Sequence, residues 1–291
     1  MATGITHTSA LTDSLPVVIA SARIVREYEG PMPGLVDKVT LEGGTGLAWK
    51  EVSFAKMTAQ AVGETEPLTN PQQAADTPFT ISPTVVGIQT LITDRVAARL
   101  SKVAFAKLGS LAQNAIQRKK DIDGLTVLDG ATVSQPGAGN VLSSGVVSAM
   151  VAQIEGNTTE PGVPPFRCVL HPYQVKDLYD ELTAGVGTYP IAEGETARIF
   201  RDGFKGTISS ASVFVDGNIT IDSSSDSKGG VFAKEAIVLV QGKVPWTKTR
   251  EEPHIGGGAT SVWVYDEYAY GERSAGNWLK EIYSDTTAPT S

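Results

Sequence analysis

One long amphipathic stretch constrains this chain most. From Ile88 to Lys120 apolar residues recur every three or four positions, as on one face of a helix with 3.6 residues per turn. Such a helix would be about 45 Å long, well beyond the usual three or four turns. We therefore expect a spine that carries the rest of the fold. Its predicted apolar face comprises Leu91, Ile92, Val96, Leu100, Val103, Ala104, Leu108, Leu111, Ala112, Ala115 and Ile116.

The composition leaves two explanations open for an unusually low density of charge. The 291 residues suffice for one large domain or two ordinary ones, and 41% are hydrophobic. Only 19% are charged, below the usual quarter or so. A strand- and loop-rich protein with many Ser, Thr and Gly would have this composition. So would a protein whose surface is largely covered by neighbouring subunits, because interface cores are depleted of charge.

Charge, cysteine content and hydropathy argue against several classes of protein. The net charge of −8 argues against tight, salt-dependent binding of nucleic acid. A single cysteine, Cys168, cannot form an intramolecular disulfide. No apolar run approaches the 18 residues or so that a membrane span needs.

Residues 42–83 are predicted to form a long extended hairpin that packs on something else. Trp49, Val52 and Phe54 are typical of a strand, but the following polar stretch contains Pro67 and Pro71 and offers few apolar side chains for a core. Before it we expect a loose start, a short helix from Ser14 to about Tyr28 and a strand from Val36 to Leu41. The alternative for 42–83 is plain disorder.

Beyond the spine, alternating patterns predict a small α/β domain and then a series of strands. Asp121 to Gly124 are expected to end the spine. A helix capped by Ser144, a buried strand with Cys168 in the core and a helix after Pro172 follow. Residues 219–222 are expected to form a strand, and residues 223–230 a mobile loop. The remaining predicted strands are Ala211–Gly217, Ala236–Gly242, Trp246–Glu252, Ser261–Ser274 and Trp278–Ser284.

No constellation of residues points to catalysis, a metal or a cofactor. His7, His171 and His254 have no partner at ligand spacing. Residues 121–124 match only a fragment of a calcium loop. The glycines of residues 43–50 lack the order of a phosphate-binding loop. We therefore expect no enzymatic activity.

The order of these segments resembles that of the major capsid proteins of tailed double-stranded DNA bacteriophages, which have the Hong Kong 97-type fold. Four stretches carry the resemblance: AVGETEPLTNPQQAADTPFTISPTVVGIQTLITDRVA, DIDGLTVLDGAT, FRCVLHPYQVKDLYDEL, and FAKEAIVLVQGKVPWTKTREE followed by TSVWVYDEYAYGERSAGNWLKEI. Together they cover most of residues 40–284. Each pattern is loose, and their order and spacing carry the argument.

The resemblance implies an α+β fold and a division of the chain into five parts. These are an N-terminal arm (1–41), an extended β-hairpin loop (42–83), a peripheral domain with the spine helix (84–124), an axial α/β domain (125–242), and closing strands with a C-terminal tail (243–291). It implies copies that meet as pentamers and hexamers around five-fold and six-fold axes. The expected location is the virion capsid, assembled in the host cytoplasm.

The resemblance also implies contacts and partners. Side chains of the extended loop would contact the next subunit: Trp49, Phe54, Met57, Glu64, Glu66, Asp76 and Phe79. A separate scaffolding protein, or none, is expected, together with a portal and a decoration protein. Weak non-specific contact with packaged DNA, or pairing with a neighbour's acids, is expected of Arg95, Arg99, Lys102 and Lys107. Lys50 and Lys56 lie in the loop, but their presence assigns no covalent crosslink.

Three other functions compete with a viral shell subunit. An encapsulin-type nanocompartment shell protein would have the same fold and hold an enzyme cargo, but the long arm and polar hairpin favour the virus. An enzyme with an unmarked active site would have a deep pocket with perturbed acids. A tail or fibre protein would have repeats or heptads, and the sequence contains neither.

Overall fold

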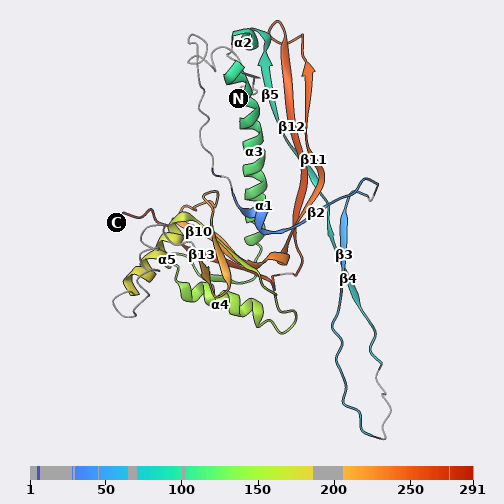
Figure 1. The fold of residues 1–291 in the computed structure, drawn as a ribbon, viewed down its shortest axis with the longest axis vertical. Coiled ribbons are helices and arrows are strands. Elements are labelled where there is room, and N and C mark those ends of the chain that lie inside the picture. Colours follow the sequence, from blue (N-terminus) through green and yellow to red (C-terminus); the bar gives the residue numbers. More distant parts are fainter. Residues whose placement is uncertain are drawn as a thin grey trace.

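The computed structural model has two bodies joined by a long helix, with a narrow hairpin projecting from their junction (Figure 1). An upper five-stranded sheet lies along helix α3, and a lower six-stranded sheet with helices α4 and α5 surrounds the foot of α3. The structure describes residues 5–6, 28, 30–44, 46–64, 71–99, 102–185, 206–274 and 276–290; for 5–6, 99, 102–108 and 182–185 it describes the backbone alone.

The described helices and strands follow one another in this order: β1 (Ile5–Thr6), α1 (Met32–Leu35), β2 (Asp37–Thr40), β3 (Trp49–Phe54), β4 (Asp76–Ile81), β5 (Thr84–Thr93), α2 (Asp94–Arg99), α3 (Lys102–Leu128), β6 (Ser134–Pro136), α4 (Ser144–Glu155), β7 (Phe166–Leu170), α5 (Pro172–Gly185), β8 (Thr207–Ile208), β9 (Ala211–Val215), β10 (Asp226–Ala233), the 3-10 turn η2 (Lys234–Ala236), β11 (Ile237–Glu251), β12 (Ala259–Glu272) and β13 (Leu279–Asp285). The expected mixture of helices and strands is therefore confirmed. The expected helix between Ser14 and Tyr28 lies almost wholly outside the described residues.

The upper sheet is built on long antiparallel strands and has the order β1-β5-β12-β11-β2. β12 pairs with β11 on one side and with all ten residues of β5 on the other. The outer strands β1 and β2 are parallel to their neighbours. Helix α3 lies along this sheet and buries Ala112 and Ile116 (Figure 1).

The start of the predicted spine helix was wrong. Residues 88–93 belong to strand β5, so Leu91 and Ile92 are buried in the sheet and not on a helix. The stretch is rich in Ile and Thr, whose branched side chains favour strands, and pairing with β12 outweighs the helical spacing. Val96 is fully buried on α2, and Leu111 is half-buried on α3. Leu100 and the side chains of Leu108, Val103 and Ala104 lie outside the description.

The predicted end of the spine helix was also wrong, because α3 continues to Leu128. The residues expected to break it serve tertiary packing. A side chain at Gly124 would place its Cβ 3.1 Å from the Cβ of Met32 and 3.1 Å from the ring of Tyr270. Asp121 is buried and accepts a hydrogen bond from the backbone nitrogen of Met32 at 3.0 Å. Local helix propensity is a weak preference that such contacts override.

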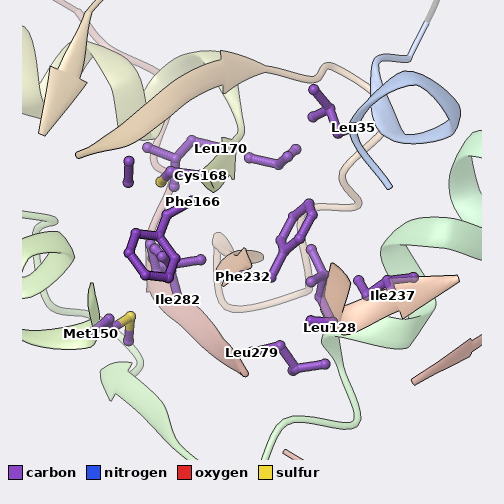
Figure 2. Close-up of a cluster of buried hydrophobic side chains, with 14 of the residues drawn as sticks. Leu35, Leu128, Met150, Phe166, Cys168, Leu170, Phe232, Ile237, Leu279 and Ile282 are labelled. Atoms are coloured by element: carbon purple, nitrogen blue, oxygen red, sulfur yellow. The ribbon is translucent and has the colours of Figure 1, made fainter. Parts of the chain in front are cut away.

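The lower body has one continuous apolar core, shown in Figure 2. Its sheet has the order β6-β13-β10-β7-β9-β8, and α4 covers β10 and β13. Phe166, Phe232 and Leu279 are fully buried there, and Leu128 brings the foot of α3 into the same core. Cys168 is fully buried, as predicted for a small core residue.

Three local predictions for the lower body were wrong. Residues 226–233, partly assigned to a mobile loop, form the internal strand β10. Its glycines allow close packing: a Cβ on Gly229 would lie 2.4 Å from the carbonyl oxygen of Val169. Residues 219–222, predicted as a strand, form only an isolated bridge from Ile221 to Ser227. The cap of α4 is Ser143 rather than Ser144.

The expected boundary at residue 242 falls inside a continuous element. Strand β11 runs through it from the lower core to the far end of the upper sheet. Gly242 lies at an irregularity in the pairing of β11 with β12. There the Lys120 ammonium contacts Asp266 at 3.0 Å and Gln241 at 2.5 Å. Strand β13 pairs with β10 in the lower sheet. The lower body is therefore built from residues that precede β11 and residues that follow β12.

The foot of α3 should be critical for folding, and its exposed face should not. We expect Leu128→Ala to lower the free energy of unfolding by about 2–5 kcal/mol, because it leaves a cavity in the lower core. Ile122→Ala on the same helix is the matched control, because Ile122 is 39% exposed and Leu128 is fully buried. Its cost should be below about 1 kcal/mol. Urea unfolding of dissociated subunits measures both, and equal losses would contradict the packing described.

Candidate assembly surface

The expected extended hairpin is present as the antiparallel pair β3–β4. Trp49 is opposite Ile81 at its base, and Phe54 is opposite Asp76 at the end of the paired region. In Figure 1 the hairpin points away from the upper sheet and extends beyond the lower body. A hydrogen bond ties it to that body: the Lys56 ammonium donates to the carbonyl oxygen of Thr158 at 2.9 Å.

The base of the hairpin packs on a small apolar cluster of its own chain. Ile81 joins the fully buried Val238 and Val240 of β11. Trp49 and Phe79 pack against this cluster, their rings edge to face with centroids 6.1 Å apart. The cluster needs the glycine on β12, because a Cβ on Gly271 would lie 2.5 Å from Ile81. The base of the hairpin is therefore anchored by packing against its own subunit.

Arg273 links that base to two other elements. Its Nε donates to Glu51 of β3 at 2.7 Å, and its Nη1 donates to Asp37 of β2 at 2.9 Å and to the carbonyl oxygen of Glu235 at 3.0 Å. The guanidinium carbon lies 5.7 Å from the centre of the Trp49 ring. Burial disfavours the charge, but the hydrogen bonds to Glu51 and Asp37 leave the pKa of Arg273 raised. Such charge-assisted bonds fix orientation as well as adding stability.

The outer half of the hairpin has little to bury. Beyond Phe54 it is held by a backbone bond from Ala55 to Ala75 and by the side chain of Gln72, which bonds both backbone groups of Thr58. Large apolar side chains nevertheless face solvent along the hairpin and its entry: Leu47 (86% exposed), Val52 (46%), Phe54 (76%), Met57 (62%) and Val62 (49%). Clustered exposed apolar side chains mark surfaces that bind another molecule.

The predicted contact residues divide into three groups. Trp49 and Phe79 are half-buried and pack on their own chain, and their expected contact with another subunit also stays a prediction. Phe54, Met57, Glu64 and Asp76 are exposed, and their contact with a second copy stays a prediction. Glu66 lies outside the described residues. Of the expected DNA-contacting cations, Arg95 is exposed on α2, and no side chain of the other three is described.

The sequence analysis did not predict the residues that anchor the base of the hairpin. Arg273, Gly271 and Val238 follow β3 by roughly two hundred residues, so no local pattern links them to Trp49. Leu47 was also missed, although it directly precedes the strand-like segment in a glycine-rich entry. An apolar residue in an otherwise polar loop was the only available signal.

Nothing in the described part of the chain forms a metal site or a membrane helix. Over those residues no cluster of three or more His, Cys, Asp or Glu is arranged to hold a metal ion. No helix there is long and apolar enough to cross a bilayer. One acid with a pKa raised by burial, Asp129, lines a cavity of about 210 Å³ beside Asp222 and Lys228. That volume is below the range of about 300–1,000 Å³ typical of ligand sites.

Comparison with solved structures identifies the fold. The capsid structure of cyanophage P-SCSP1u matches with a TM-score of 0.72 at 11% identity, over 97% of this chain and 96% of that chain. The head structure of Helicobacter pylori bacteriophage KHP40 matches with a TM-score of 0.71 at 12% identity, over 97% and 98%. The chain has a phage capsid fold. A third capsid structure, from cyanophage Pam1, matches with a TM-score of 0.70 at 11% identity, over 99% of this chain and 100% of that chain.

Comparison with family models and with curated sequences does not detect the likeness that the three-dimensional structure shows. No protein-family model matches the chain, and neither does the sequence of any curated protein. The matches cover nearly the whole of each chain, so the likeness is not limited to one part of this chain. Sequence identity of 10–13% is compatible with a shared fold when the pattern of buried and exposed positions is preserved.

Arg273 should control the hairpin and not the fold of the subunit. We expect Arg273→Gln to speed amide hydrogen exchange in β3 and β4 by about tenfold, because it removes charge-assisted bonds to Glu51 and Asp37. Exchange in β10 and β13 should stay unchanged. Arg250→Gln is the control, because Arg250 is exposed and pairs only with Glu252 among the ion pairs described. Faster exchange throughout the lower sheet would contradict a local role for Arg273.

Proposed function

We propose that this protein is the major capsid protein of a tailed phage and assembles into the icosahedral shell around a double-stranded DNA genome. The observation that carries the proposal is the near-complete match of the chain to several phage capsid structures. In this proposal the fold is of the Hong Kong 97 type. The upper sheet with α3 is the peripheral domain, and the lower body is the axial domain, whose copies meet in pentamers and hexamers.

The hairpin supports assembly through contact with a second copy. Its base is buried against β11 and fixed by Arg273, so it cannot fold back to cover its own apolar side chains. Burying the exposed side chains of Phe54 and Met57 therefore stabilises the protein only when a neighbouring subunit covers them. Repeated heterologous contacts of this kind close into rings and shells. The exposed acids Glu64 and Asp76 would set register more than affinity.

An encapsulin-type shell is the second candidate function, since its subunit would have the same fold. Phage heads and capsids among the structural matches favour the virus. We infer a location in the virion, with assembly in the host cytoplasm. A scaffolding protein, a portal and a decoration protein remain expected partners. Packaged DNA would be contacted weakly, with Arg95 as the one described exposed cation among those predicted. The net charge of −8 is consistent with a shell that binds its packaged DNA only weakly.

Shell formation is directly observable. The purified full chain, alone and with candidate scaffolds over a range of salt concentrations, should sediment as capsomer rings or closed shells. Negative-stain electron microscopy should then show particles of uniform size. Monomers under every condition would contradict the proposal.

The outer hairpin should be needed for assembly and dispensable for folding. We expect replacement of residues 57–73 by a short Gly-Ser linker to leave β3–β4 and the subunit intact. The free energy of unfolding should fall by less than about 1 kcal/mol, because the removed side chains are exposed where they are described. Shells should be absent or malformed. Normal shells from this variant would contradict the assignment of the hairpin.

A point substitution tests the same surface without shortening the chain. Met57→Ser should reduce shell yield, because it removes an exposed apolar contact of the hairpin. Val141→Ser in the lower body is a matched control, since the two side chains are 62% and 63% exposed. Both variants should melt like the wild type. Equal shell yields would contradict a special role for the hairpin.

A further inference from the structure

Two buried carboxylates meet where the N-terminal segment crosses the spine helix. Asp121 projects from α3 and is 1% exposed, and Asp216 directly follows β9 and is fully buried. Burial raises the pKa of Asp216, and the neighbouring Asp121 raises it further. No ion pair described in the structure includes either of them, although a buried charge ordinarily needs a partner.

Asn218 bridges the two acids. Its backbone nitrogen donates to Asp216 Oδ1 at 2.9 Å, and its Nδ2 donates to Asp121 Oδ2 at 2.9 Å. The backbone nitrogen of Met32 donates to the remaining oxygen, Asp121 Oδ1. Three of the four carboxylate oxygens thus have N–H donors, and the buried Oδ2 of Asp216 has none among the described residues.

The N-terminal segment is closely fitted onto this pair. A Cβ on Gly30 would lie 1.7 Å from the carboxyl carbon of Asp121, so only glycine fits there. The Tyr28 hydroxyl donates to the carbonyl oxygen of Val215 at 2.9 Å, and the Tyr28 carbonyl accepts from Asn218 Nδ2 at 3.2 Å. Tyr28 and residues 30–36 therefore dock on a surface whose centre is the acid pair.

The titratable groups around the pair supply no compensating positive charge in the described contacts. From β12, the Tyr270 hydroxyl is buried without a hydrogen-bond partner among the described residues, and burial followed by Asp121 raises its pKa. On α3, Lys119 pairs with Asp123, and Lys120 pairs with Asp266. Asp123 also accepts from the Tyr268 hydroxyl. Arg118 lines a cavity of about 380 Å³ beside Tyr28 and Gly30.

We propose that Asp121 and Asp216 share one proton, and that this proton holds Tyr28 and residues 30–36 on the body of the subunit. The proton completes the hydrogen bonding of Asp216 Oδ2 and leaves one negative charge in the buried pair. When it passes to solvent, two adjacent carboxylates are charged in a site sealed from water, and repulsion favours release of the segment. The pair titrates as a unit.

The direction of the pH dependence follows from the raised pKa of Asp216 in the docked state. Burial raises the pKa of the Asp216 carboxyl to about 7, and Asp121 adds to the rise, while the Asn218 amide lowers it. Release of the segment admits water to the pair and lowers this pKa toward about 3.9, the value of an exposed aspartate. Docking therefore takes up a proton in a window that lies between about pH 4 and pH 7. The docking equilibrium should weaken by up to about tenfold per pH unit across that window and level off above it.

We call this arrangement the proton latch: the proton shared by Asp121 and Asp216 holds Tyr28 and residues 30–36 on the subunit. Hydrogen exchange of the purified full chain tests the latch. Protection factors for residues 30–36, corrected for the intrinsic exchange rate, should fall between pH 5 and pH 7 by about tenfold or more. Asp216→Asn replaces the shared proton with an amide N–H that can donate to Asp121. It should keep the segment protected at pH 8 and abolish the slope. Glu155→Gln, at an exposed acid on α4, is the control and should retain the wild-type slope.

Three results would overturn the latch. One is a flat pH dependence in the wild type, and another is an unchanged slope in Asp216→Asn. The third is protection that rises with added Mg²⁺ or Ca²⁺ and falls with chelator, because the carboxylates would then hold a cation. If Asp216→Asn does not fold, Asp121→Asn provides the same comparison of slopes. None of these measurements depends on shell formation, so the latch and the proposed function fail separately.

Discussion

The hairpin can be long and poor in apolar residues because its base is fixed to the subunit. Ile81, Val238 and Val240 bury one another, and Arg273 joins β3 to β2 and to the turn before β11. A two-stranded hairpin is marginal by itself in water. Its packed base gives it a direction, and its exposed outer half remains available for contact with another molecule. The rest of the fold supports that arrangement.

Helix α3 and strand β11 make the two bodies one unit. Both run from the upper sheet into the lower core, where Leu128 and Ile237 are buried together (Figure 2). Near the bend of β11, Lys120 contacts Asp266 and Gln241 and lies over the ring of Tyr268. Breaking a buried pair of this kind is costly, because it leaves an uncompensated charge. The angle between the upper sheet and the lower body is thus tied to the spine.

The sequence predicted the elements whose pattern is local and strong. The strand around Cys168, the helices on either side of it and the strand-like segments near the end were all found, because their apolar spacing fits one structure. The spine was found but misplaced at both ends. Residues 88–93 fit a helix and a strand equally well by spacing, and only pairing with β12 decides between them. Gly124 was mistaken for a helix end, although tertiary packing accounts for it.

The candidate site was predictable in outline and not in detail. A polar, proline-containing segment with isolated aromatic residues indicated a hairpin that needs other surfaces, and β3–β4 has that form. The sequence could not distinguish Trp49 and Phe79, which pack on their own subunit, from Phe54 and Met57, which face solvent. That distinction depends on neighbours such as Val238 and Gly271, far away along the chain.

The central claim is that the outer hairpin lies on a different copy of the chain. Isotope-resolved photo-crosslinking tests it most directly, with a photoreactive amino acid at position 57 in particles assembled from equal amounts of ¹⁴N- and ¹⁵N-labelled protein. For random mixing between copies, about half of the crosslinked peptide pairs should carry one label of each kind, as expected for heterologous contacts in a closed assembly. Crosslinks joining only peptides of the same isotope would show that the hairpin lies on its own subunit and would contradict the account.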